Sequence, residues 1–187
     1  MTALIILLAI VIVLGGYVLF LYNSLVSRRN RVDEGWSDID VQLKRRYDLI
    51  PNLIESVKGY MEHERETLEA VTRARTAAMT AQASGNTAEL AQAENQITAA
   101  LKTIFAVSEQ YPNLRANENF LQLQQELADT ENKIMASRRF YNGQVRDFNT
   151  AIQHFPALVV AGPLGFKSRA FFELADESER ANPEVKF

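Results

Sequence analysis

The chain has 187 residues, with 20 Lys and Arg, 23 Asp and Glu, two His and no Cys. The lack of cysteine excludes disulfides, thiolate metal sites and cysteine nucleophiles, and two histidines are too few for a histidine-rich metal centre. Eight Gly and five Pro are too few for a turn-rich all-β chain. The net charge of −3 argues against a broadly basic nucleic-acid-binding surface, so no nucleic-acid partner is expected.

All charged residues lie beyond residue 27. Residues 3–22 read ALIILLAIVIVLGGYVLFLY, and a helix of this length rises ~30 Å, the thickness of a bilayer's hydrocarbon core. The segment lacks the basic start and the small-x-small cleavage site of a signal peptide. The sequence therefore predicts an uncleaved transmembrane anchor over residues 1–25. Arg28, Arg29 and Arg31 follow it, so the positive-inside rule predicts an external N-terminus and a cytoplasmic body.

Beyond the anchor, apolar residues recur at steps of three and four, a period typical of helices that bury one face in a bundle. Four such runs cover residues 32–50, 54–78, 90–111 and 120–152. No segment has the alternating pattern of a half-buried strand. The sequence thus predicts an all-α chain, in which the N-terminal transmembrane helix precedes an antiparallel, up-and-down four-helix bundle of long helices over residues 26–155.

Turn residues separate the runs. Ser84-Gly85-Asn86 divides the second run from the third, and Asn86 with Glu89 has the spacing of a capping box at a helix start. Pro112 and Pro156 mark the later breaks. The connections are short, which favours antiparallel neighbours.

Pro51 suits the first position of a helix, so separate helices are expected over residues 28–47 and 51–83. If both stood upright, the second helix would be the longer one, at ~50 Å against ~30 Å, and its polar end would re-enter the bilayer. We therefore expect a tilt of the bundle or a joint at residues 23–27. One long helix kinked at Pro51 is the alternative.

Several charges fall on the predicted apolar stripes, at Arg46, Glu64, Arg75 and Glu94. Polar groups at such positions can fix helix register or partner choice, and slippage of the stripe around the helix is a comparable explanation. The basic run Lys44-Arg45-Arg46 is expected to form ion pairs within the bundle, or else a protein-docking patch. The acids offered as partners are its neighbours Asp40, Asp48 and Glu55.

The segment at residues 155–172 reads FPALVVAGPLGFKSRAFF and is too interrupted to span a bilayer. Three uses remain open: a lid over the open end of the core, a foot at the membrane interface with Lys167 and Arg169 near headgroups, and a subunit contact. With the acidic tail it forms a third region, residues 156–187. The candidate interaction or oligomer residues are Phe155, Leu158, Val159, Leu164, Phe166, Phe171 and Phe172.

Three stretches together resemble the bacterial LemA family. They are YNSLVSRRNRVDEGWSDIDVQLKRRYDLIPNLIESVKGYMEHE at residues 22–64, YPNLRANENFLQLQQELADTENKIMASRRFYN at 111–142, and the segment at 155–172. The resemblance implies a membrane-anchored four-helix bundle with no established enzymatic activity, no catalytic residues and no cofactor. Proteins of this family look like scaffolds or interaction factors at bacterial membranes. Some are encoded near a membrane metalloprotease, and a relative belongs to the magnetosome apparatus.

One residue departs from the expected pattern: Gly35 stands where such proteins are expected to have Ala, at a helix cost of ~1 kcal/mol. The conspicuous polar residues of the motifs suit buried networks that join helix ends, or else an exposed partner-binding face. The candidate structural polar network is Asp40, Arg46, Asn52, Asn119, Glu131, Arg138 and Asn142.

The resulting functional prediction is a single-pass scaffold or adaptor that self-associates at the bacterial inner membrane through its helical bundle. Its expected partners are further copies of itself and the lipid bilayer. The alternative is a binding module that presents a substrate to a membrane enzyme, or regulates one, such as a metalloprotease. No metal site is expected, because the sequence MEHERE around His63 lacks the second histidine of HExxH.

Overall fold

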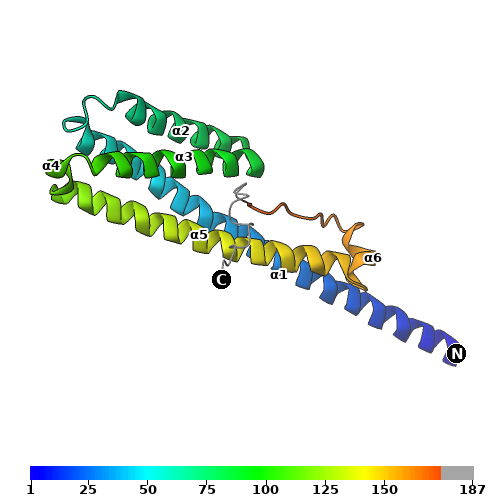
Figure 1. The fold of residues 1–187 in the computed structure, drawn as a ribbon. Helices are drawn as coiled ribbons and strands as arrows, with labels where there is room; N and C mark the ends of the chain where they lie inside the picture. The colour runs from blue at the N-terminus through cyan, green and yellow to red at the C-terminus, as the bar shows by residue number, and fades with distance from the viewer. Residues whose placement is uncertain (174–187) are drawn as a thin grey trace, which may run out of the picture. The chain divides into compact units, whose positions relative to one another are not determined.

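The computed structural model describes residues 1–173, and every regular element in that range is helical. Helix α1 spans Thr2–Lys58 and α5 spans Glu118–Gln153 (Figure 1). The shorter helices are α2 (Arg65–Ser84), α3 (Thr87–Ser108), α4 (Pro112–Arg115) and α6 (Ala157–Ala161). The prediction of an all-α chain with long antiparallel helices is confirmed. The part of the predicted acidic tail beyond Glu173 lies outside the described residues.

The helices form two compact units, and α1 and α5 contribute to both. The first unit contains Met1–Asp40 and Ala136–Phe171, and the second contains Val41–Met135 and resumes at Phe172. The first unit therefore holds the apolar start of α1, the second half of α5, and α6. The second unit holds the end of α1, the helices α2 to α4, and the first half of α5.

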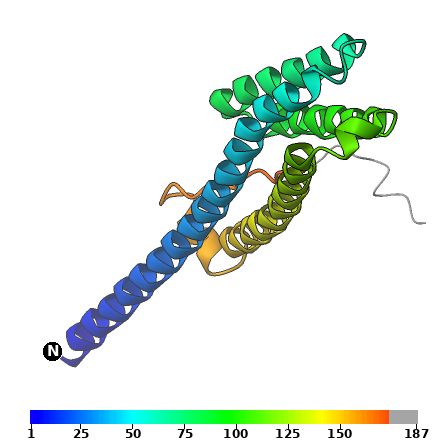
Figure 2. The same cartoon turned by 90° about the vertical axis from the view of Figure 1, so that its left-hand side faces the viewer.

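In the second unit, short connections make successive long helices run antiparallel. Helices α2 and α3 lie side by side in both ribbon views (Figure 1, Figure 2). Gly85 ends α2 with a left-handed φ of 72°, a conformation that glycine adopts without steric cost. Asn86 then accepts hydrogen bonds from the backbone N–H groups of Ala88 and Glu89, and its amide donates to the Glu89 carboxylate at 2.8 Å. The predicted capping pair is confirmed.

The prediction that Pro51 begins a new helix is wrong. Helix α1 continues through Pro51 to Lys58, and the chain turns only at residues 59–64. The helix is also unbroken at residues 23–27, where a joint was expected as the alternative to a tilt of the bundle. Since α2 has 20 residues and rises only ~30 Å, it is shorter than the part of α1 beyond Tyr22. Helix α2 thus lacks the length of ~50 Å on which the expected re-entry into the bilayer depended.

The predicted stripes supply most of the core. All four runs contribute buried apolar side chains, as expected for helices that each bury one face. The buried members include Val32, Ile39, Leu43, Ile50, Val57, Val71, Leu90, Ile97, Ile104, Phe120, Leu127, Ile134, Val145 and Phe148.

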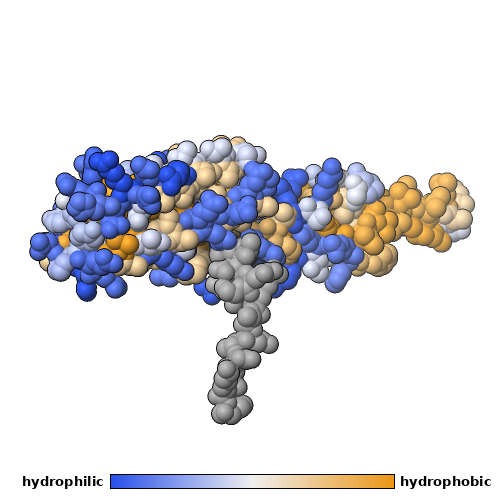
Figure 3. Space-filling view, turned by 45° about the horizontal axis from the view of Figure 1, so that its top comes forward, coloured by the Kyte–Doolittle hydropathy of each residue, from blue (hydrophilic) through white to orange (hydrophobic). Residues whose placement is uncertain are grey.

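The start of α1 has the opposite character. Among the described residues, α1 is the one helix long and apolar enough to cross a membrane. Its most apolar 18-residue window has a mean hydropathy of 3.1, and none of that window is buried. Figure 3 shows this hydrophobic surface toward the N-terminal end of the chain. By length and composition, this part of α1 is suited to be a membrane anchor.

Gly35 lies where α1 and α5 approach closely in the first unit. It is buried, and a Cβ placed there would lie 3.2 Å from the Cα of Tyr141 and 3.3 Å from the Phe140 ring. A side chain at this position must push against the backbone of α5. Gly35 weakens its own helix, but it permits the close packing of two helices.

We expect Gly35→Leu to lower the free energy of unfolding by about 1–3 kcal/mol, because overpacking forces α5 away from α1. Gly143, inside α5, is the matched control because a Cβ there would meet no heavy atom within 4 Å. Gly143→Ala should therefore stabilise the protein by ~1 kcal/mol through helix propensity alone. Chemical unfolding of the full chain in mild detergent, followed by circular dichroism, measures both changes. Effects of the same sign would contradict the close approach at Gly35.

Candidate functional site

The centre of the second unit is polar. Arg46 of α1 is only 1% exposed and forms ion pairs with Glu94 of α3 and Glu131 of α5. Its Nη1 group also donates a hydrogen bond to Thr98 Oγ1 at 3.2 Å. Burial lowers the pKa of Arg46, and the Glu131 carboxylate opposes that shift. The deep charge is tolerated because two carboxylates compensate it.

Glu94 is the second buried charge of this polar core. It is buried almost as fully as Arg46 and accepts a hydrogen bond from the Tyr47 hydroxyl. Arg46, Tyr47, Thr98, Glu94 and Glu131 thus link α1, α3 and α5. The linkage is specific in orientation, because each carboxylate must meet a donor on another helix.

The ion-pair partners differ from those offered by the sequence. The acids considered were Asp40, Asp48 and Glu55, which are neighbours of the basic run, whereas the structure gives Arg46 two partners on other helices. The adjacent Arg45 likewise reaches across to Glu126 of α5, at 3.9 Å and in a more exposed setting. Sequence proximity is a poor guide here. Asp40, Asp48 and Glu55 lie six, two and nine positions from Arg46, whereas residues on one helix face are three or four positions apart.

The carbonyl of Tyr47 explains how α1 passes through Pro51. In an uninterrupted helix the N–H of residue 51 would donate to this carbonyl, and proline has no N–H. Arg75 of α2 supplies the missing donor, because its Nε lies 2.8 Å from the Tyr47 carbonyl oxygen. A tertiary hydrogen bond therefore replaces the one that the proline removes.

All four charges singled out on the apolar stripes have partners away from their own helix. Arg46 and Glu94 pair with each other, and Arg75 bonds the Tyr47 carbonyl. Glu64 accepts from the Tyr111 hydroxyl at 3.3 Å, and burial together with the Glu64 charge raises the pKa of Tyr111.

The predicted polar network is dispersed over the two units. Arg46 and Glu131 are in direct contact. In the first unit, Arg138 is buried and Asn142 is partly buried. The remaining members are exposed, namely Asp40, Asn52 and Asn119. The prediction named the centre of the network but omitted Glu94 from it, although an acid on the stripe of Leu90 and Ile97 already indicates a buried cationic partner.

In the first unit, residues 165–170 form a clasp that holds the C-terminal segment against α1 and α5. Phe166 is buried. Its ring meets Tyr22 and Phe148 edge-on, with centroids 5.8 and 6.3 Å away, and the Arg29 guanidinium lies 5.7 Å from its centroid. These contacts combine apolar burial with a cation–π interaction.

Polar contacts complete the clasp. The Asn149 amide bonds both backbone groups of Arg169, at 2.8 and 2.9 Å, and the Arg169 guanidinium pairs with Asp33 at 2.9 Å. The Tyr141 hydroxyl donates to the Ala170 carbonyl at 3.0 Å. Burial raises the pKa of Tyr141, while the nearby Arg169 charge opposes that shift.

The candidate interaction residues divide by burial. Phe166 and Phe172 are buried within the chain. The other five are exposed, and Phe155 reaches 83% exposure: Phe155, Leu158, Val159, Leu164 and Phe171. Four of the five exposed side chains thus lie within residues 155–164, and both buried ones lie beyond that range.

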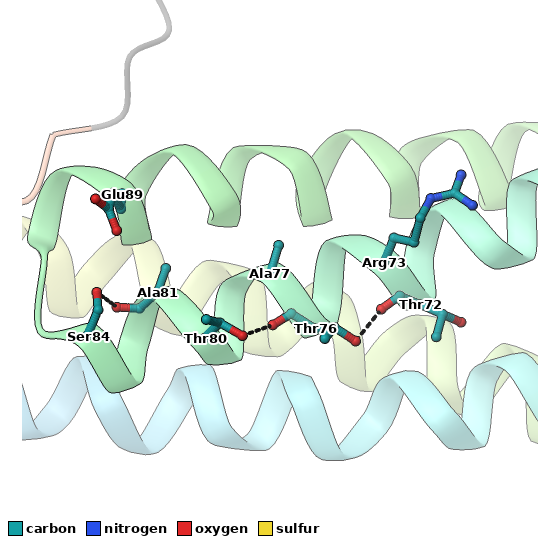
Figure 4. A pocket seen from close by; sticks show the side chains of 8 residues that line it. All are labelled: Thr72, Arg73, Thr76, Ala77, Thr80, Ala81, Ser84 and Glu89. Carbon is teal, nitrogen blue, oxygen red and sulfur yellow. Dashed lines mark hydrogen bonds between the residues drawn. The ribbon is translucent and has the colours of Figure 1, made fainter.

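A shallow pocket along α2 and the start of α3 offers little chemistry (Figure 4). The hydroxyls of Thr72, Thr76 and Thr80 each donate to the carbonyl four residues earlier, so their protons are already used. Arg73 at its edge pairs with Glu69 at 3.4 Å. Within residues 1–173, no group of three or more His, Asp or Glu lies close enough to hold a metal ion.

Within residues 1–173, these features define a class of protein: an all-α chain with one candidate membrane helix, a helical body and a buried Arg–Glu core. The chain belongs to the LemA family, whose model matches residues 35–187. It is 32% identical over 161 residues to Protein LemA of Metamycoplasma hominis, a match that covers 86% of this chain and 72% of the relative. The resemblance seen in the sequence motifs is confirmed.

Two more distant relatives are the magnetosome proteins MamQ 1 and MamQ 2 of Paramagnetospirillum magneticum. Each is 22% identical to this chain over 175 residues. The match covers 81% of this chain and 64% of each relative, so the chain spans slightly less than two thirds of their length.

Proposed function

We propose that this protein is a single-pass scaffold or adaptor of the bacterial inner membrane that self-associates through its helical bundle. The observation that carries the proposal is the apolar start of α1, none of which is buried. Exposed apolar surface of this extent is unfavourable in water, and its length fits a bilayer core. Helix α1 continues from this segment to Lys58 without a break, so the anchor and the body share one helix.

The proposed orientation places the N-terminus outside and the body in the cytoplasm. Arg28, Arg29 and Arg31 follow the apolar segment directly and are exposed. Basic residues within the first turns beyond a span favour the cytoplasmic side.

A scaffold fits the remaining polar groups better than an enzyme does. The most buried charges pair with each other, and the threonine hydroxyls of the α2 pocket are bonded to their own helix. Exposed apolar side chains on the second unit are available for contacts between copies, namely Val41, Met79, Leu121 and Met135. Confinement by an anchor raises the effective concentration of such contacts.

The test is mild detergent solubilisation of the full chain, followed by imaging and native mass measurement. We expect homogeneous particles that contain several copies of the chain. Met79→Glu and Leu121→Glu should lower the copy number, because both place a charge at an exposed apolar position. Asn119→Glu, which adds a charge at an exposed polar position, should leave it unchanged.

Single copies at every concentration, in detergent and in lipid nanodiscs, would count against self-association. A stoichiometric second protein in the particles would instead support the alternative function, a binding module for a membrane enzyme such as a metalloprotease.

A further inference from the structure

We propose that the exposed apolar side chains of residues 155–164 insert into the interfacial layer of an anionic lipid bilayer, as a second membrane contact beside α1. We call this segment the foot. The proposal rests on the proposed anchoring by α1. It adds a lipid-binding surface formed by residues more than a hundred positions further along the chain.

The foot has an inverted pattern of burial. In α6 the two small residues, Ala157 and Ala161, are buried, whereas Leu158 and Val159 are exposed. Phe155, just before α6, is also exposed. A helix that faces water buries its largest apolar side chains first, so this arrangement suits contact with an apolar medium.

The register of the first unit places the foot at the end of the apolar span. Gly35 of α1 contacts Tyr141 of α5, and α5 runs on for twelve more residues to Gln153, a descent of about 18 Å. Because α1 and α5 are antiparallel here, an equal descent along α1 from Gly35 reaches Asn23, the first polar residue after the span.

The contacts of the clasp independently place the foot level with the end of the apolar span of α1. Phe166 contacts Tyr22, a residue at the end of the span, and lies against Arg29, about two helical turns beyond Tyr22. Chain that leaves α5 and returns to Phe166 must therefore pass close to this level. At that depth the foot meets the boundary between headgroups and acyl chains, where amphipathic segments bind.

The charges around the foot identify the kind of lipid. A hollow of about 230 Å³ beside Phe166 is lined by Arg29, Lys167, Ser168 and Arg169, with Arg28 and Arg31 exposed nearby along α1. Asp33 pairs with Arg169, but the basic groups around the hollow still outnumber this one acid. Such a cluster beside an apolar surface matches the phosphate groups of anionic lipids.

The absence of cysteine from the chain makes single-cysteine labelling direct. Leu158→Cys and Val159→Cys test the foot, Val11→Cys marks the span, and Ser37→Cys marks an exposed position further along α1. Each full-length variant carries a small fluorophore and sits as one copy in a nanodisc of mixed phosphatidylglycerol and phosphatidylcholine. Quenching is measured with spin-labelled lipid and with aqueous iodide.

Relative to Ser37→Cys, lipid quenching at positions 158 and 159 should be at least about twofold higher, because interfacial side chains lie ~5–10 Å into the headgroup boundary. Iodide quenching should fall correspondingly. Nanodiscs of phosphatidylcholine alone should weaken the lipid quenching, and Lys167→Gln should reduce this dependence on lipid charge. Equal quenching in both lipids would overturn the assignment to anionic lipid.

Two further outcomes separate this inference from the anchoring on which it depends. If Val11→Cys is quenched by lipid while positions 158 and 159 are quenched by iodide, the foot is overturned and the anchor stands. If Val11→Cys itself is quenched by iodide, the proposed anchoring fails. Shielding of positions 158 and 159 from both quenchers would show a protein contact and would also overturn the lipid assignment.

Discussion

Arg46→Met should lower the free energy of unfolding by about 3–5 kcal/mol, because it leaves Glu94 buried without its cation. Glu131 pairs with the same guanidinium, but its side chain is 30% exposed and can regain water. The main cost therefore arises at Glu94. Unfolding of the full chain by denaturant in mild detergent, followed by circular dichroism, measures the change.

The double variant Arg46→Met/Glu94→Gln should be more stable than Arg46→Met, since it removes both buried charges together. Arg45→Met is the matched control, because Arg45 is its sequence neighbour and pairs with Glu126 in an exposed setting. It should change stability by less than about 0.5 kcal/mol. Equal, small effects of Arg45→Met and Arg46→Met would contradict the central role of the buried charge.

The same double variant tests whether the polar core serves specificity as well as stability. If Arg46 and Glu94 fix the register of the helices, replacing both with uncharged residues should change the number of copies in the particles. A more stable protein with an unchanged copy number would contradict the hypothesis that Arg46 and Glu94 fix helix register or partner choice.

The second large effect concerns the proline inside α1. A proline in a helix interior costs about 3 kcal/mol, and Arg75 offsets part of this cost through its hydrogen bond to the Tyr47 carbonyl. Pro51→Ala should therefore stabilise the protein by about 1–3 kcal/mol. Arg75→Met in the native background should cost about 1.5–3 kcal/mol, the range for hydrogen bonds to charged groups.

The double variant distinguishes compensation from coincidence. In the Pro51→Ala background, the N–H of residue 51 can donate to Tyr47, so Arg75→Met should cost far less than in the native background. Arg73→Met is the control, because Arg73 lies on the same helix and its pair with Glu69 is exposed. Strictly additive effects of Pro51→Ala and Arg75→Met would show that the two positions are not coupled.

The helix faces and the cap at Asn86 could be predicted from the sequence because they depend on residues three or four positions apart. The end of the first helix could not be predicted this way. The local rule for Pro51 gives a break, but a donor on α2 overrides it, and no local pattern connects Pro51 with Arg75. Tertiary contacts commonly override local preferences of this size.

The candidate residues show the same limit. A charge on an apolar stripe was enough to single out Arg46 and Glu94, whereas their pairing needed the three-dimensional arrangement of α1 and α3. Phe155 and Phe166 are the same residue type and lie in the same apolar segment, yet Phe155 is exposed and Phe166 is buried. Their burial differs because Phe166 belongs to the clasp and Phe155 does not.

The clasp also has a consequence for the order of folding. The contact between Arg169 and Asp33 joins residues 136 positions apart, whereas α2 and α3 pair across a short turn. Contacts between sequence neighbours form faster than contacts between distant residues. The pairing of α2 and α3 can therefore form early, whereas the clasp forms only once residues 165–170 are present. Until then, Tyr22 and Arg29 of α1 lack their contacts with Phe166. A chain truncated before Phe166 never forms these contacts.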